Sequence, residues 1–421
     1  MMIQDVLIIG GGASGIFTAL QLGKLAPHLH ITVLESQGQP LGKVKISGGR
    51  RCNVTHNIEG NAKQWLAYYP RQHNKLRHLL HQFDGVAMRA WLQKHGVATH
   101  AEADGRVFPH TNDSQTIIDT FLRVLKKQGG VLQLKQSVKT LSYDADSQRW
   151  QATLNTATGR TLHADAVVLA TGSSPKGYAL CQQLSIQLAP MAPSLFTFVV
   201  KDERLTSLAG CSLPWVTVTI PAANGNSKEA IKTEGPLLVT HWGVSGPAIL
   251  KASAWGALAL QACEYTTTVF VDTCPSLPYE TLRQWLLAQK QEQAKKQLDN
   301  VLPKESGMPQ RFWGYALQSA VLPLTQRWGD TSDKALNQLC EHLKRHPLAI
   351  QGKGTFKEEF VTCGGIDLSE VEGTTLRLKH RPPHLYAVGE LLNVDGVTGG
   401  FNFQHCWASA TAVATHIATA Q

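Results

Sequence analysis

The first 35 residues restrict the fold more than any other part of the chain. Residues 5–9 are a short, nearly continuous apolar run, which is typical of a parallel strand covered on both faces. The run leads into a G-x-G-x-x-G pattern that begins at Gly10 and ends at Gly15, and a helical pattern follows. A second apolar run at 31–34 ends at Glu35. This order of strand, glycines, helix, strand and acid predicts a dinucleotide-binding βαβ unit.

Each part of this motif has a mechanical role in binding a dinucleotide. Gly10 allows a tight turn, Gly12 lets a pyrophosphate approach the backbone, and Gly15 lets helix and strand pack closely. The helix N-terminus presents free N–H groups to the phosphates, and Glu35 can accept hydrogen bonds from ribose hydroxyls. We therefore expect the first cofactor contacts at Gly10, Gly12, Ala13, Ser14, Gly15, Glu35 and Ser36.

Two later segments favour FAD as the dinucleotide. Residues 165–169 form an apolar strand that ends in Ala-Thr-Gly, after strands at 131–134, 138–143 and 150–155 that we interpret as a meander. Residues 384–388 form another strand, which ends in a glycine and an acid. If both ends of the chain share one sheet, that acid, Glu390, would lie near the middle of the cofactor.

The last segment predicts a helix with a glycine-rich start. Residues 396–401 contain three glycines, and an apolar helical face continues to about residue 419, with Asn402 as the expected N-cap. The glycines would let a flat ring approach the helix N-terminus. The helix dipole there could stabilise negative charge on a reduced flavin.

With these motifs in place, the chain resembles the BaiN-like, or aminoacetone-oxidase-type, family of FAD-dependent oxidoreductases, relatives of the two-dinucleotide-binding flavoproteins. The resemblance covers nearly the whole chain. Its most specific segment is G-K-V-K-I-S-G-G-R-R-C-N-V-T at 42–55. Further matching segments lie at 105–109, 240–247, 361–365 and 389–402.

The resemblance implies an α/β fold with a discontinuous Rossmann-like FAD-binding domain, made of a central parallel sheet and a β-meander. This domain would comprise residues 1–190 and 350–421. An inserted substrate-side domain would occupy 191–349, with β-strands at about 191–275 and helices at about 276–349. In the insert we expect strands at 196–201, 215–220 and 269–272, and helical stretches at 279–302, 310–328 and 334–345.

The resemblance also extends the set of expected cofactor contacts. The loop from Ser47 to Asn53 offers backbone N–H groups, guanidinium groups and an amide, and we take Cys52 in it as a small packed residue. The added contacts are Lys43, Ser47, Gly48, Gly49, Arg51, Cys52, Asn53, Val138, Ala170, Thr171, Gly172, Gly389, Glu390, Asp395, Gly399, Gly400, Phe401 and Asn402.

The chain departs from the family pattern at three places. Arg50 stands where the family has a third glycine, and the stretch before Ser47 is one residue shorter. The loop after Gly172 is cut to residues 173–178. His405 and Cys406 occupy positions that usually carry other residues. All three sites should lie near the cofactor, so the substrate can differ from that of better-known members of the family.

Composition limits the compartment and the partners. The chain begins without a signal-like segment and has no run of eighteen apolar residues, so we expect a cytoplasmic protein without a membrane span. Eight scattered cysteines include no C-x-x-C pair, which argues for reduced thiols and against a dithiol reductase, a zinc ribbon or an iron–sulfur cluster. We expect no metal. The net charge of +9 is spread along the chain, so we do not expect nucleic acid as a partner.

The predicted function is an FAD-dependent oxidoreductase that transfers hydride between flavin and a small organic substrate. NADH or NADPH is the expected electron donor and would bind transiently, since no second G-x-G-x-x-G follows a strand. An amine oxidase that uses oxygen, a flavin-dependent RNA-modifying enzyme and a non-catalytic FAD-binding protein remain alternatives. His241 and His405 are the candidate proton-transferring groups, although a structural histidine is the preferred interpretation of each. The sequence leaves the oligomeric state open.

Overall fold

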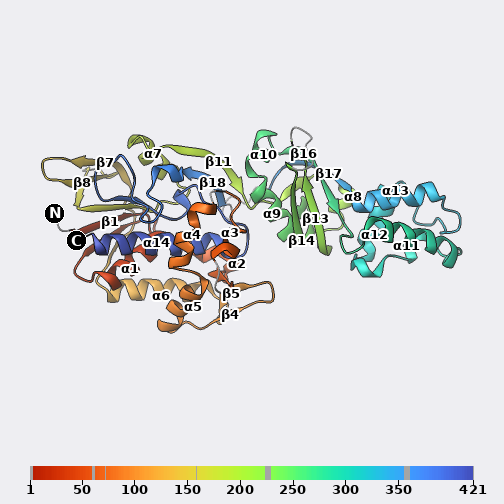
Figure 1. Ribbon diagram of the computed structural model, residues 1–421, viewed down its shortest axis with the longest axis horizontal. Helices are drawn as coiled ribbons and strands as arrows, with labels where there is room; N and C mark the ends of the chain where they lie inside the picture. Colours follow the sequence, from red (N-terminus) through yellow and green to blue (C-terminus); the bar gives the residue numbers. More distant parts are fainter. Residues whose placement is uncertain are drawn as a thin grey trace. The chain divides into compact units, whose positions relative to one another are not determined.

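The computed structural model describes residues 3–58, 62–71, 73–157, 159–222, 229–354 and 361–420. The chain forms two compact units (Figure 1). Unit 1 contains residues 1–192 and 357–421, and unit 2 contains residues 193–356.

The centre of unit 1 is a five-stranded parallel sheet in the order β19-β10-β1-β2-β6. Its strands are β1 (Asp5–Ile9), β2 (His30–Leu34), β6 (Val131–Gln133), β10 (Ala166–Leu169) and β19 (Leu385–Ala387). All residues of β10 and β19 are buried, as expected for strands covered on both faces. Because all neighbouring pairs are parallel, the carboxyl ends of the strands meet at one edge.

Two long helices pack against each other beside this sheet. They are α1 (Ala13–Leu25) and α14 (Phe401–Thr419) (Figure 1). Phe17 of α1 is fully buried and lies 5.1 Å from the ring of Trp407 on α14. Ring contacts of this kind add to the burial of large apolar surface. This packing fixes the N-termini of both helices near the sheet edge.

The meander differs from the sequence-based expectation in its first strand. Residues 131–134 were expected to belong to it, but β6 instead pairs in parallel with β2, with Val131 opposite Thr32. The meander is formed by β7 (Val138–Asp144), β8 (Arg149–Leu154) and β9 (Thr161–Ala164). A three-residue edge strand carries too little side-chain pattern to identify its partner, which explains the error.

Shorter elements complete unit 1. A small sheet has the order β3-β5-β4, and β11 pairs with β18. The bounds of these strands are β3 (Thr55–His56), β4 (Thr99–Ala101), β5 (Arg106–Pro109), β11 (Leu188–Ser194) and β18 (Val361–Ile366). The helices are α2 (Gly42–Arg50), α3 (Ala62–Leu66), α4 (His73–Gln82), α5 (Gly85–Lys94), α6 (Ser114–Lys127) and α7 (Pro175–Gln183).

Unit 2 combines a closed antiparallel barrel with a helical portion. The barrel order is β12-β15-β14-β13-β16-β17, so none of these strands has a free edge. The strands are β12 (Phe198–Val200), β13 (Ser212–Ile220), β14 (Ile231–Thr240), β15 (Gly243–Ser245), β16 (Thr266–Asp272) and β17 (His346–Lys353). The helices are α8 (Glu203–Thr206), α9 (Pro247–Trp255), α10 (Ala257–Ala262), α11 (Tyr279–Glu292), α12 (Gln310–Ser319) and α13 (Asp333–Lys344).

Two helices of unit 2 end earlier than expected. The helix expected over 279–302 ends at Glu292, and the one expected over 310–328 ends at Ser319. The second expectation ran a helix through Pro323, which lacks a backbone N–H and clashes with the preceding turn.

A directed chain of hydrogen bonds links the barrel of unit 2 to its helices. The Tyr315 hydroxyl lies 3.1 Å from Asp202 Oδ2 and 3.1 Å from His346 Nε2. A carboxylate only accepts, so Tyr315 donates to Asp202 and accepts from His346 Nε2–H. When His346 is neutral, its Nδ1 accepts from His342 Nε2, which lies 2.8 Å away. Burial favours the neutral form of His346, which is 5% exposed.

This arrangement predicts acid sensitivity of unit 2. Burial, followed by the neighbouring His342, lowers the pKa of His346 to about 3. In the folded state His346 therefore remains unprotonated at pH values where the unfolded state already binds a proton, since the ordinary pKa of histidine is about 6.5. The stability contributed by neutral His346 is complete above that pH and is lost as the pH falls toward 3.

We expect the free energy of unfolding to fall by roughly 2–3 kcal/mol between pH 6.5 and 4.5 on account of this residue. In urea denaturation across this pH range, the free energy of unfolding should depend less steeply on pH for His346→Gln than for the parent chain. His163→Gln, which changes an exposed histidine of β9, is the matched control and should leave the dependence unchanged. Equal slopes for His346→Gln and the parent would refute the assignment.

Candidate functional site

The carboxyl edge of the parallel sheet gathers most of the expected cofactor residues. Gly10 follows β1, Glu35 follows β2, Ala170 follows β10, and Gly389 lies just beyond β19. Ligands of open parallel sheets bind at this edge, where neighbouring loops diverge. Segments from both ends of the chain therefore contribute to one candidate site.

The glycine turn is shaped by close backbone approach. Gly10 has φ +117°, and a Cβ there would lie 2.3 Å from the carbonyl oxygen of Ala170. A Cβ on Gly15 would lie 1.9 Å from the carbonyl oxygen of Gly10. Gly12, by contrast, has open space around a Cβ and is the N-cap of α1, with no side chain capping that helix. The N–H groups at the start of α1, including those of Ala13 and Ser14, thus face a space that suits a pyrophosphate.

Glu35 is oriented by the backbone of the same turn. Its Oε2 accepts a hydrogen bond from Gly11 N at 2.9 Å, and its Oε1 accepts from Gln37 N at 2.7 Å. Ser36 is exposed and its hydroxyl lies 3.3 Å from Glu35 Oε1. The carbonyl oxygen of Glu35 accepts from Gln136 N at 2.8 Å, which brings the start of β7 at Val138 toward this end of the site. Two backbone N–H groups thus fix the Glu35 carboxylate beside the glycine turn.

A charged cluster occupies the middle of the edge. Lys43 Nζ lies 2.5 Å from Glu390 Oε2 and 3.0 Å from Ser173 Oγ. The other carboxylate oxygen of Glu390 accepts from Thr362 N at 3.0 Å. A Cβ on Gly172 would lie 3.6 Å from Glu390. The cluster joins α2, the shortened loop and the segment after β19, none of which are neighbours in sequence.

The Thr171 side chain near this edge packs against Gly177 of α7, where a Cβ would lie 1.9 Å from Thr171 Oγ1. Thr171 Oγ1 is buried without a hydrogen-bond partner in the described part of the chain. Buried hydroxyls are normally hydrogen-bonded. The uncapped N-terminus of α1 and the open space at Gly12 make the edge compatible with a dinucleotide such as FAD.

The start of α14 is also shaped by glycines. Gly399 and Gly400 have φ values of +131° and +92°. A Cβ on Gly400 would lie 2.5 Å from the carbonyl oxygen of Thr55 and 2.9 Å from Asn53 Oδ1. Gly400, not Asn402, is the N-cap, and no side chain caps the helix. The Asn402 amide instead donates to Gly396 O at 2.9 Å and accepts from Gly396 N at 2.8 Å, which closes the glycine turn. The expected cap was wrong because Asn402 already lies within the first helical turn.

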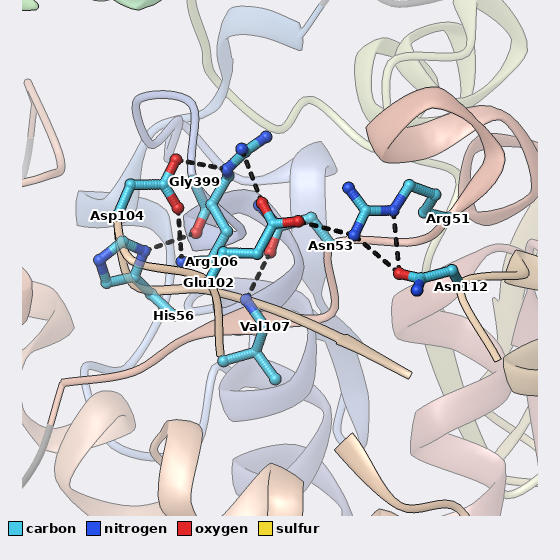
Figure 2. Close-up of polar contacts among 9 residues, drawn as sticks. All are labelled: Arg51, Asn53, His56, Glu102, Asp104, Arg106, Val107, Asn112 and Gly399. Carbon is cyan, nitrogen blue, oxygen red and sulfur yellow. Dashed lines mark hydrogen bonds and ion pairs between the residues drawn. The ribbon is translucent and has the colours of Figure 1, made fainter. Parts of the chain in front are cut away.

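Phe401 is part of an aromatic cluster. It is 1% exposed and stacks on Tyr68 at 4.2 Å between ring centroids, with an interplanar angle of 10°. His56 stacks on it at 4.7 Å and donates from Nδ1 to Gly399 O at 3.0 Å (Figure 2). These contacts fix the Phe401 side chain and, through it, the backbone of the preceding glycine turn.

The loop from Ser47 to Asn53 is anchored by Arg51. Its guanidinium lies 4.0 Å above the Phe108 ring and donates to Glu102 at 2.7 Å and to Asn112 at 2.7 Å (Figure 2). Arg106 donates to the other oxygen of Glu102 at 2.8 Å. The guanidinium of Arg51, expected at the cofactor, is therefore engaged with β5 and its surroundings.

The rest of this loop turns inward. Ser47 donates to Val44 O at 2.8 Å, and Asn53 Oδ1 accepts from Val107 N at 3.3 Å. Gly48 and Gly49 have φ values of +56° and +68°. Cys52 is fully buried, and burial raises the pKa of its thiol to about 12, so it is a neutral packed group.

Asp395 has a partner that sequence reasoning missed. It is fully buried, and Arg71 donates to its Oδ1 from Nε at 2.9 Å and to its Oδ2 from a second nitrogen. A buried carboxylate requires such a partner. The two residues lie 324 positions apart, and no local pattern relates them. The described geometry therefore assigns Asp395 an ion pair beside the glycine turn.

The two candidate histidines lie in different environments. His405 on α14 is 2% exposed, and its Nε2 lies 3.2 Å from the Gly389 carbonyl, to which it donates. Burial lowers its pKa to about 4, so it is a neutral group that supports Gly389. His241 is exposed in the turn between β14 and β15 of unit 2.

The described residues, 3–58, 62–71, 73–157, 159–222, 229–354 and 361–420, contain neither a membrane-spanning helix nor a metal-binding cluster. None of their helices has the length and apolar character required to cross a membrane. No group of three or more His, Cys, Asp or Glu residues in those ranges is placed to hold a metal ion.

Comparisons with known proteins agree with this geometry. The family model described as HI0933-like protein Rossmann domain matches residues 4–416. A ribosomal RNA dihydrouridine synthase of Escherichia coli is 29% identical over 433 residues, covering 99% of this chain and 98% of that protein. A 3-dehydro-bile acid delta(4,6)-reductase of Clostridium scindens is 26% identical over 429 residues, covering 96% of each. A 3-ketosteroid delta1-dehydrogenase of Sterolibacterium denitrificans shares the fold, with a TM-score of 0.51, 13% identity and 99% of each chain covered.

The contrast between the motif glycines predicts separable effects on FAD binding. Gly12→Ala should fold normally, since its Cβ meets nothing in the chain, but should raise the FAD dissociation constant at least about tenfold by intruding on the pyrophosphate. Gly10→Ala should lower both the melting temperature and FAD affinity, because its Cβ would collide with Ala170.

Gly373→Ala, at a glycine with open surroundings, is the matched control and should change neither property. FAD binding is measured by quenching of flavin fluorescence, and folding by thermal denaturation. Unchanged FAD affinity in Gly12→Ala would show that the pyrophosphate does not lie against this turn.

Proposed function

The chain belongs to the HI0933-like protein Rossmann domain family, and we propose that this FAD-dependent oxidoreductase reduces a carbon–carbon double bond conjugated to a carbonyl group. The proposed donor is NADH or NADPH. The preferred substrate is a uracil base within RNA, whose product is dihydrouridine.

The observation that carries the proposal is a shared reaction among full-length relatives. The E. coli relative and a Haemophilus influenzae relative at 28% identity both bear the name ribosomal RNA dihydrouridine synthase. The C. scindens relative is named as a reductase of a bile acid with an oxidised 3-position. In uracil and in such a dienone alike, the double bond that accepts hydride is conjugated to a carbonyl. This common chemistry also disfavours an amine oxidase.

The residues at the sheet edge suit this reaction. Bound FAD supplies hydride transfer at its flavin ring. The uncapped N-terminus of α1 would hold the pyrophosphate, and the Glu35 carboxylate would accept from ribose hydroxyls. The uncapped N-terminus of α14 would direct its N–H groups and positive dipole toward negative charge on the ring.

The buried groups near this edge are kept neutral. Burial, with the carboxylate of Glu390 as a second cause, raises the pKa of Cys406 to about 12, and His405 is neutral as well. These neutral neighbours add no negative charge beside the N-termini of α1 and α14, while Glu390 pairs with Lys43. Such an environment favours the binding of anionic groups.

An RNA substrate departs from the sequence-based expectation that nucleic acid is not a partner. That expectation rested on the dispersion of basic residues, and a net charge of +9 is equally compatible with contacts to a phosphate backbone. A free enone is the second candidate substrate, and the bile-acid reductase at 26% identity is the observation that favours it.

The test of the reaction is a dihydrouridine assay. FAD-loaded protein and NADPH, or NADH, are incubated anaerobically with ribosomal RNA transcribed without modification, and the digested nucleosides are analysed by mass spectrometry. We expect dihydrouridine, two mass units heavier than uridine, at one or a few positions. The Gly12→Ala variant without added FAD is the control and should form much less.

A parallel experiment tests the donor. Stopped-flow absorbance should show bleaching of the oxidised flavin band on mixing with NADPH or NADH. Bleaching followed by reoxidation with an unsaturated ketone, but not with RNA, would favour the second substrate. No bleaching with either nucleotide in protein that dithionite does reduce would eliminate both pyridine nucleotides as donors.

A further inference from the structure

Arg50 has a backbone conformation that side-chain-bearing residues rarely adopt. Its φ is +68°, and it follows Gly48 at +56° and Gly49 at +68°. A glycine would accept this conformation without strain, whereas a residue with a Cβ does so only where the surroundings impose it. Strained positions of this kind cluster at functional sites.

The surroundings impose the conformation from both sides. Arg51 is fixed by Glu102, Asn112 and the Phe108 ring. Cys52, at φ +60°, is buried, and its N–H donates to Ser47 O at 3.0 Å. The anchoring of the loop therefore does not depend on the side chain of Arg50.

No contact within the described part of the chain accounts for the guanidinium of Arg50. The residue is exposed, and in the described ranges no acceptor forms a hydrogen bond or ion pair with it. Residues 36–58 contain four Lys and Arg residues and no Asp or Glu. Two of the four are neutralised, Lys43 by Glu390 and Arg51 by Glu102. The positive charges of Lys45 and Arg50 remain exposed.

The loop borders the candidate cofactor edge. Three residues after Arg50, the Asn53 amide oxygen lies 2.9 Å from the position of a Cβ on Gly400, at the N-terminus of α14. A guanidinium presents a planar fork of donors that matches the oxygens of a phosphate. An unpaired fork beside this edge suits recognition of a phosphate that arrives with the reactants.

We propose that Arg50 is a specificity residue that binds a phosphate group of a reactant, which rests on the proposed function. The phosphate belongs either to the RNA backbone or to the pyridine nucleotide, and the recognition chemistry is the same for both. The proposal assigns FAD itself no contact with Arg50, and the FAD affinity of Arg50→Gly tests this point.

The test uses FAD-loaded protein and three variants. Arg50→Gly removes the fork and relieves the strain, Arg50→Lys keeps the charge without the fork, and Arg160→Gly removes an exposed arginine before β9 as the matched control. Binding of a fluorescent single-stranded RNA twelve-mer is followed by anisotropy at three salt concentrations. Flavin reduction by NADPH and by NADH is followed by stopped flow over a range of nucleotide concentrations.

We expect Arg50→Gly to weaken RNA binding roughly five- to tenfold and to reduce the slope of log K against log salt by about 0.7, the value for one phosphate on a single strand. Arg50→Lys should be intermediate, and Arg160→Gly should change the affinity less than about twofold. FAD affinity and melting temperature should not fall in Arg50→Gly. If the apparent affinity for NADPH or NADH weakens in Arg50→Gly while RNA binding does not, the phosphate is assigned to the nucleotide.

The proposal is overturned if neither reactant responds to Arg50→Gly, if Arg160→Gly has an equal effect, or if Arg50→Gly loosens FAD. Absence of binding by the parent chain to both RNA and nucleotide overturns it too. Failure of the proposed function can be distinguished from failure of this proposal. In that case Arg50→Gly still weakens the binding of a phosphate-bearing reactant, but the parent chain forms no dihydrouridine and reduces no enone.

Discussion

Close contact between backbones at the carboxyl edge of the parallel sheet is the constraint on which the site depends. A side chain at Gly10 would collide with Ala170, one at Gly15 with Gly10, and one at Gly389 with Ser14 Oγ at 2.4 Å. These contacts draw the ends of β1, β10 and β19 together around the start of α1. Since such approach excludes even a methyl group, three strands from distant parts of the sequence converge on one helix N-terminus.

A second set of contacts carries this arrangement to α14. His405 supports the Gly389 carbonyl from one helical turn, and the Ser409 hydroxyl accepts from Gly389 N at 3.0 Å from the next. The aromatic cluster around Phe401 and the Asn402 amide fix the glycine turn that precedes the helix. The two uncapped helix N-termini are thus positioned by neutral hydrogen bonds and ring packing. Their dipoles are not neutralised by a capping carboxylate, which suits anionic ligands.

The parts of the fold that the sequence predicted are those with local signals. The order of strand, glycines, helix and acid lies within 35 residues and identified the Rossmann-like sheet, and the apolar face after Gly400 identified α14. Contacts between distant segments left no such signal. Arg71 with Asp395 and Arg51 with Glu102 depend on how loops meet in space, and β6 was misplaced because three residues do not specify a partner. The Asn402 cap failed for a finer reason, because a capping residue and a residue two positions further differ only in backbone angles.

The pairing of β11 with β18 bears on how such a protein changes over evolution. The chain leaves unit 1 through β11 and returns through β18, and a Cβ on Gly364 would lie 2.4 Å from the Pro190 carbonyl, so the two connections run side by side. Because the two ends of the inserted segment are adjacent, its length has little effect on the folding of unit 1. Unit 2 can therefore be lengthened, trimmed or replaced without changing the register of the cofactor-binding sheet. The insert can diverge in sequence and in size while the sheet of unit 1 and its glycine turn are inherited unchanged.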